Sequence, residues 1–200
     1  IHRFDPKTPV EETMEALHDV VKAGKVRYLG ASSMFAWQFA KLQATAQQHG
    51  WTRFVSMQDQ YSLLMREEER EMFGLLADQG VGSLPWSPLA AGRVARPWGE
   101  AGTNRSQTAP EADFAGRPLF LESDQGIVDA VEQIAADRGV AMASVALAWV
   151  LRNPVVTAPI VGSTKQHHLT DAVAALDIEL TEHEVTALED HYALRQPTYF

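Results

Sequence analysis

The chain has 200 residues, 46% of them apolar, a formal net charge of −9 and no cysteine. The negative charge argues against nucleic acid and anionic membranes as partners, and the absence of thiols excludes disulfides and cysteine-bound metals. No uncharged apolar run reaches the ~18 residues of a membrane-spanning helix and no signal peptide is recognisable, which favours a globular cytoplasmic protein.

Strand-like and helical segments alternate along the first half of the chain. The first helix is expected to begin at a capping box, Thr8-Pro9-Val10-Glu11, and to end near Gly24. The same criteria of apolar period and glycine endings predict strands at Val26–Ala31, Phe54–Gln58 and Val81–Trp86, and helices at Phe35–Gln48 and Glu67–Asp78. The run Glu67-Glu68-Glu69-Arg70-Glu71 is interpreted as a solvated first turn, where carboxylates suit the helix dipole.

A long irregular segment separates these elements from a second set of helices. Residues 92–123 show no sustained period, and a loop of about 30 residues after a strand is interpreted as a lid over a ligand. Beyond it we predict helices at Ile127–Asp137, Ala143–Arg152 and Gln166–Leu176, a strand at Val155–Val161, and a last helix capped by Thr181 and Glu184. Alternating strands and helices predict an α/β fold of parallel βαβ units, with functional groups at the carboxyl ends of the strands.

Five segments, in order and with matching spacing, resemble aldo-keto reductases. They are Ile1–Pro6 with Glu11–Leu17, Gly24–Ser33, Gln58–Leu63, Trp86–Gly92, and Pro159–Thr164 with Leu169 and Asp171. The resemblance covers essentially the whole chain and implies a (β/α)8 TIM barrel, of which residues 1–200 supply roughly strands 4–8 of a single domain. Because the sequence opens without Met at Ile1-His2, like the tail of a strand, the N-terminal strands of that barrel are expected to be absent from it.

The resemblance implies an oxidoreductase that transfers hydride from NADPH to an aldehyde or ketone, with NAD(H) as the alternative cofactor and no metal. Hydride transfer leaves negative charge on the carbonyl oxygen, which calls for a proton donor and a polarising hydrogen-bond donor. His2 matches the histidine that orients the carbonyl in this family. The family's catalytic Tyr, Lys and Asp have no counterpart in this chain.

The same resemblance assigns nicotinamide contacts to strand ends. Ser32, Ser33 and Gln58 match the groups that hold the nicotinamide carboxamide, and Trp86 matches the aromatic ring that stacks on the nicotinamide. Each residue also has a purely structural interpretation. Ser33 could cap the following helix, Gln58 could be a buried structural amide, and Trp86 could be a core tryptophan.

Phosphate and adenine contacts are implied for the turn after Trp86, for the long loop and for the start of a later helix. These residues are Ser87, Pro88, Leu89, Ala90, Gly92, Arg93, Arg105, Gly162, Thr164, His168 and Asp171. Backbone amides at tight turns and helix starts suit phosphates, although helix capping is the competing interpretation at Gly162 and Thr164. His168 stands where the family often has Arg, which weakens the preference for NADP over NAD.

Other functions stay open at the level of sequence. The chain could be a non-catalytic or regulatory nicotinamide-binding barrel, an inactive truncated fragment, or a barrel that uses a different cofactor. His2 favours the enzyme, because regulatory members of the family often replace this histidine. Trp86-Ser87-Pro88-Leu89 argues against a different cofactor.

Overall fold

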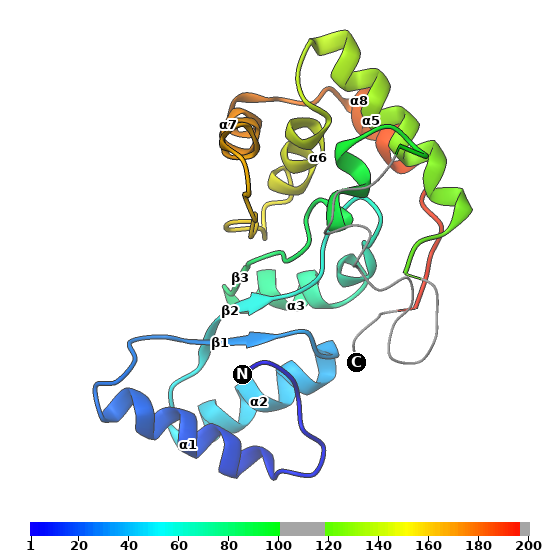
Figure 1. Cartoon of the computed structure of the whole chain (residues 1–200). Coiled ribbons are helices and arrows are strands. Elements are labelled where there is room, and N and C mark those ends of the chain that lie inside the picture. The colour runs from blue at the N-terminus through cyan, green and yellow to red at the C-terminus, as the bar shows by residue number, and fades with distance from the viewer. Residues whose placement is uncertain (101–118, 197–200) are drawn as a thin grey trace. The chain divides into compact units, whose positions relative to one another are not determined.

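A computed structural model describes residues 1–100 and 119–196, which fall into two compact units (Figure 1). The described part of unit 1 comprises residues 1–59 and 68–84, and that of unit 2 comprises residues 60–67, 85–100 and 119–196. The chain has an α/β structure with a parallel sheet, as the alternating pattern predicts.

Unit 1 is a parallel three-stranded sheet with helices between its strands. Its strands are β1 (Leu29–Ser32), β2 (Phe54–Gln58) and β3 (Gly82–Ser83), and they lie in the order β1-β2-β3. Its helices are α1 (Val10–Lys22), α2 (Ala36–His49) and α3 (Met72–Gln79). Helices α1 and α2 pack side by side next to β1 (Figure 1). The three strands therefore end at one edge of the sheet, which sets up the candidate site.

The core of unit 1 forms between the sheet and α2. The rings of Phe39 and Phe54 stack with centroids 5.9 Å apart, and both side chains are buried. The buried amide of Gln43 donates to the carbonyl of Phe54 at 3.1 Å and accepts from its N–H at 2.9 Å. This pair satisfies the first backbone groups of β2, so a polar residue is tolerated inside the core.

Unit 2 is built around α6 (Met142–Leu151). Every residue from Ser144 to Val150 is buried, so α6 is apolar on all sides, as expected for a central helix. The helices around it are α5 (Gln125–Arg138), α7 (Gln166–Ala174) and α8 (Glu182–Glu189), with α8 packed on α5. Four 3-10 helices complete the described chain: η1 (Glu67–Glu69), η2 (Ala90–Ala95), η3 (Glu122–Asp124) and η4 (Ala175–Asp177).

One of the two predicted capping boxes forms. The Thr181 hydroxyl accepts from the N–H of Glu184 at 3.3 Å, and the N–H of Thr181 donates to the Glu184 carboxylate at 2.7 Å. The box at Thr8 is wrong, because the N-cap of α1 is Pro9 and no side chain caps it. The Thr8 hydroxyl instead donates to the Asp5 carboxylate at 2.7 Å.

The predicted strand at Val155–Val161 is not present. One ladder-like bond links this segment to its surroundings, from Ile160 N–H to the Pro85 carbonyl at 2.8 Å. Pro154 and Pro159 have no N–H to donate, which prevents a continuous ladder. Strands β1 and β3 are likewise shorter than the sequence predicted, whereas β2 matches its predicted bounds.

The run Glu67–Glu71, which is acidic except for Arg70, also differs from its interpretation as a solvated helical turn. Residues 67–69 form the 3-10 helix η1, α3 begins only at Met72, and Glu67 is just 6% exposed. One carboxylate oxygen of Glu67 accepts from the Tyr192 hydroxyl and from the Arg195 N–H, both at 2.9 Å. These partners are distant in sequence, so local periodicity could not reveal them.

The same C-terminal segment carries a buried ion pair. The Arg195 guanidinium lies 2.5 Å from Oδ1 of Asp124, and the two side chains are 8% and 1% exposed. The other oxygen of Asp124 accepts from the N–H of Leu121 at 2.9 Å. Burial and the neighbouring carboxylate of Glu67 raise the pKa of Tyr192 above its ordinary value, so this phenol stays a hydrogen-bond donor.

Candidate functional site

The carboxyl ends of β1 and β2 bring three candidate residues together in unit 1. The Gln58 carbonyl accepts from the Ser32 hydroxyl at 2.6 Å and from the Ser33 N–H at 3.1 Å. The side chain of Gln58 is exposed, so the interpretation as a buried structural amide is wrong. Ser33 does not cap α2 either, because the N-cap is Phe35. The convergence of these three residues follows from parallel strands that end at one edge.

His2 lies beside the same strand ends. The backbone nitrogen of Ile1 donates to the Gly30 carbonyl at 2.6 Å, and the Arg3 guanidinium lies 3.4 Å from the Ser32 hydroxyl. These contacts hold residues 1–3 along β1. Ile1 and His2 were predicted to be the end of a strand, but no strand forms there. The side chain of His2 is exposed.

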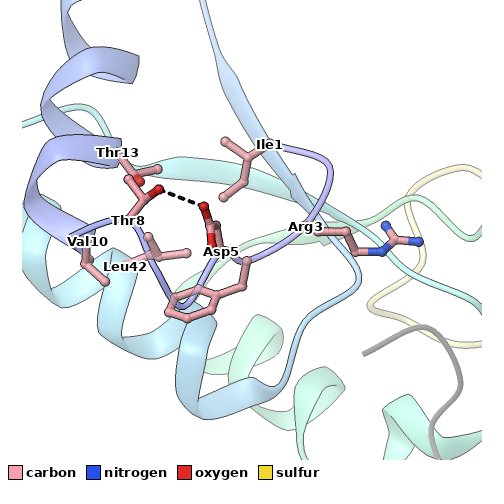
Figure 2. Close-up of a pocket in the computed structure, with 8 residues that line it drawn as sticks. Ile1, Arg3, Asp5, Thr8, Val10, Thr13 and Leu42 are labelled. Atoms are coloured by element: carbon pink, nitrogen blue, oxygen red, sulfur yellow. Dashed lines mark hydrogen bonds between the residues drawn. The ribbon is translucent and has the colours of Figure 1, made fainter. Parts of the chain in front are cut away.

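A cavity of about 140 Å³ lies between the N-terminal segment and the helices of unit 1 (Figure 2). It is lined by Ile1, Arg3, Phe4, Asp5, Thr8, Val10, Thr13 and Leu42. In Figure 2 the Arg3 guanidinium points away from the other lining side chains. Hydrogen bonds from the N–H of Lys7 and the hydroxyl of Thr8 hold the pKa of Asp5 below its ordinary value. None of the candidate residues lines this cavity, so it is not the candidate site.

The turn after Trp86 has an unusual backbone. Ser87, Ala90 and Ala91 have φ of +52°, +48° and +56°, a region that disfavours residues with a Cβ. The turn is closed by bonds from Ala90 N–H to the Ser87 carbonyl at 2.9 Å and from Gly92 N–H to the Leu89 carbonyl at 2.7 Å. Trp86 itself is half-buried and pairs with Gln60 in an isolated parallel bridge. The predicted turn-like segment is present, and it is strained.

Arg93 follows this turn and carries an unsatisfied donor. Its guanidinium carbon lies 3.8 Å above the ring of Phe120, and its buried Nε has no hydrogen-bond partner in the described part of the chain. A buried donor without an acceptor is unfavourable by about 1–3 kcal/mol, which is unusual in a native fold. The second arginine predicted from the long loop, Arg105, lies outside the described residues, as does most of the predicted lid.

The start of α7 holds the last candidate residues. Gly162 and Thr164 are exposed, and the N-cap is Lys165 without a side-chain cap, so capping by serine or threonine does not occur. The N–H of Thr164 lies 3.4 Å from Nδ1 of His168. The backbone carbonyl of Asp171 accepts a hydrogen bond from the Ser144 hydroxyl at 2.7 Å, so the Asp171 carboxylate is not used in that bond. The N–H groups at this helix start can therefore face an anion.

One buried residue at the strand ends was not predicted from the sequence. Asp59 directly follows β2 and is 0% exposed, and its Oδ1 accepts from the Ser83 hydroxyl at 2.7 Å. Burial raises the pKa of Asp59 to about 7. The signal in the sequence was an acid immediately after an apolar strand, inside the Gln58–Leu63 segment that carried the family resemblance.

Two further features bear on the class of site. Within residues 1–100 and 119–196, no group of three or more His, Asp or Glu side chains could hold a metal ion. No single helix in those ranges is long and apolar enough to cross a membrane. One consecutive pair of helical segments, residues 122–138 and 142–151, is together long and apolar enough to cross a membrane, but the two segments are bent by 106° relative to each other.

Comparison with known proteins identifies the family. The sequence model of the aldo/keto reductase family matches residues 1–193, so the chain belongs to this family and the resemblance is confirmed. The chain is 47% identical over 192 residues to versiconal hemiacetal acetate reductase of Aspergillus parasiticus, covering 96% of this chain and 56% of that protein.

Two other fungal relatives are similar over the same region. Aldo-keto reductase AMT2 of Alternaria alternata is 50% identical over 198 residues, covering 98% of this chain and 52% of the relative. Aldo-keto reductase dtxS3 of Metarhizium robertsii is 46% identical over 197 residues, covering 96% and 51%. The chain therefore spans about half the length of the curated relatives it matches.

Proposed function

We propose that this chain is the cofactor-holding part of a cytoplasmic NADP(H)-dependent oxidoreductase that reduces an aldehyde or ketone to an alcohol. Its fold would be a single-domain (β/α)8 barrel, with residues 1–200 supplying roughly strands 4–8. Membership of the aldo/keto reductase family supports the reaction class. The parallel order β1-β2-β3 with intervening helices supports the barrel.

The observation that carries the proposal is the location of backbone strain. Four residues other than glycine have positive φ in the described part of the chain, namely Ser33, Ser87, Ala90 and Ala91. All four lie in the segments that the family resemblance assigns to the cofactor. Such conformations cost roughly 1–3 kcal/mol each and persist where a function requires them, so their grouping supports a binding site at these turns.

The residues of unit 1 suit the nicotinamide carboxamide. The exposed amide of Gln58 can donate and accept, and the Ser32 hydroxyl and the Ser33 N–H both donate to the Gln58 backbone carbonyl. In unit 2, the half-buried ring of Trp86 would stack on the nicotinamide and fix which face is turned to the substrate.

Phosphate recognition falls to unit 2 in this proposal. The strained turn at residues 87–92 would lie against the phosphates, and the buried Nε of Arg93, which has no partner in the described part of the chain, is a donor that an anion would satisfy. The open N-terminus of α7, with Gly162 and Thr164, would take the adenosine 2′-phosphate of NADP. His168 and Asp171 would contact the adenosine. Because His168 stands where the family often has Arg, NAD(H) remains the alternative cofactor.

When bound, a reduced nicotinamide supplies the hydride. The imidazole of His2 would donate a hydrogen bond to the carbonyl oxygen of the substrate and so orient it and favour the developing negative charge. The proton donor of the family, a tyrosine, has no counterpart among residues 1–200. This chain's own contribution is therefore to bind the cofactor and to orient the carbonyl compound.

Titration and turnover of the native polypeptide that contains this chain test the proposal. We expect saturable binding of NADPH, followed by fluorescence, and oxidation of NADPH on addition of an aromatic aldehyde. Binding without oxidation would favour the regulatory alternative. Failure to bind either NADPH or NADH would contradict the proposal.

Replacing Trp86 by alanine tests the stacking role. The variant should bind NADPH more weakly by ~1–3 kcal/mol, because the stacking and burial of the indole are lost. Isothermal titration of the variant against the wild type measures this loss. Trp37→Ala, at an exposed tryptophan of α2 that the proposal does not use, is the matched control and should leave the affinity unchanged. Equal affinity of Trp86→Ala and wild type would remove Trp86 from the site.

Ala91→Gly tests the strain in the turn. Glycine tolerates φ of +56°, so the variant should be more stable than the wild type by roughly 0.5–1 kcal/mol, after allowing for the greater freedom of unfolded glycine. Ala95→Gly in the same 3-10 helix, where φ is not positive, should be less stable instead. Urea denaturation measures both values, and a loss of stability in both variants would contradict strain at position 91.

A further inference from the structure

Asp59 occupies an unusual position just beyond the carboxyl end of β2. The side chain is fully buried, Oδ1 accepts the Ser83 hydroxyl at 2.7 Å, and Oδ2 has no hydrogen-bond partner in the described part of the chain. A buried carboxyl with one oxygen left without a donor costs more than an apolar residue of similar size. Neither the family resemblance nor the proposed binding residues gives Asp59 a role.

The bond between Asp59 and Ser83 strengthens a weak part of the sheet. Strand β3 has only two residues, and its paired positions with β2 end at Met57 and Ser83. The bond from Leu84 N–H to the Met57 carbonyl at 2.8 Å adds one further backbone link beyond these pairs. The side-chain bond from Asp59 continues the connection past the end of the ladder.

Gln58 lies between this connection and β1. Its carbonyl holds Ser32 and Ser33, while the next residue, Asp59, is tied to β3. The peptide that presents the Gln58 amide is thus fixed from both sides. The carboxyl ends of β1, β2 and β3 are joined by side-chain bonds centred on residues 58 and 59.

We propose that Asp59 is a positioning residue for the nicotinamide, which acts by tying β2 to Ser83 and so holding Gln58 against Ser32 and Ser33. This inference rests on the proposed function, in which those three residues hold the carboxamide. Because Asp59 is buried, it does not touch the cofactor itself. Its effect should be confined to the nicotinamide end of the dinucleotide.

Ser83→Ala tests this role in the native polypeptide, with NADPH and 2′-phospho-ADP-ribose as ligands. The second ligand is the same dinucleotide without nicotinamide. Loss of a hydrogen bond worth about 1 kcal/mol should weaken NADPH binding about 5-fold and leave 2′-phospho-ADP-ribose unaffected. Asp59→Asn keeps an acceptor for Ser83 in the same shape, so it should bind NADPH as the wild type does.

Ser56→Ala, which removes another hydroxyl from the same sheet, is the control and should change neither affinity. Melting curves identify any variant that fails to fold. If Ser83→Ala does not fold, the milder Ser83→Thr takes its place. This variant retains the hydroxyl, so its NADPH affinity should equal that of the wild type. Unchanged NADPH affinity in folded Ser83→Ala, or an equal loss for both ligands, would overturn the positioning role. A wild type that binds neither NADPH nor NADH would instead refute the proposed function.

Discussion

Arg195→Ala should lower the free energy of unfolding by about 3–5 kcal/mol, the range measured when one partner of a buried ion pair is removed. The carboxylate of Asp124 is 1% exposed and, among the described residues, would keep the N–H of Leu121 as its donor. The penalty therefore arises mainly from the charge left behind rather than from the lost attraction. Urea denaturation of the native polypeptide measures the change.

A surface ion pair of unit 2 provides the control for this prediction. Arg152 lies 3.5 Å from Glu182, but the two side chains are 44% and 89% exposed. Arg152→Ala should cost no more than about 1 kcal/mol, because water screens the pair. Similar losses in the two arginine variants would show that burial of Asp124 does not govern the effect.

Asp59→Asn should abolish the pH dependence that Asp59 gives to stability. The pKa of Asp59 is about 7 in the folded chain and 3.8 ordinarily, so between these values the folded state holds a proton that the unfolded state has lost. The free energy of unfolding must then fall as pH rises through this window, by up to about 4 kcal/mol, and level off above it. Asparagine does not titrate, so the variant should gain stability relative to the wild type as pH rises.

Denaturation at several pH values between 4 and 8 measures this difference. At pH 4 the two proteins should be similar, because the carboxyl is protonated in the folded state and only partly ionised in the unfolded state. At pH 8 the variant should be the more stable by several kcal/mol. A constant difference across the range would mean that Asp59 ionises in the folded chain as freely as in water.

The sequence predicted the parts of the fold that depend on local pattern. The bounds of β2 matched because aromatic and β-branched residues in a short run between polar residues favour a strand. Ser32, Ser33 and Gln58 were expected to meet because parallel strands end at a common edge, and the hydrogen bonds to the Gln58 carbonyl confirm that they do. Their role in binding a cofactor stays a prediction.

Features that depend on distant partners could not be predicted in the same way. Glu67 resembled a residue of a solvated helical turn, yet its carboxylate is bound by Tyr192 and the N–H of Arg195. Asp59 resembled an ordinary polar residue after a strand, and only the position of Ser83 on a neighbouring strand shows why it is buried. Charged residues carry no periodic signal for such pairing, because it is decided by tertiary packing.

The bonds between Glu67 and the C-terminal segment affect the order in which the chain can fold during synthesis. The donors to the Glu67 carboxylate are Tyr192 and Arg195, which lie 125 and 128 positions further along the chain. All three strands of the unit 1 sheet lie before residue 84, so this sheet can assemble while the ribosome is still translating the rest. The bonds that Glu67 receives from Tyr192 and Arg195 can form only after residue 195 has left the exit tunnel, so this part of unit 2 is completed late in synthesis.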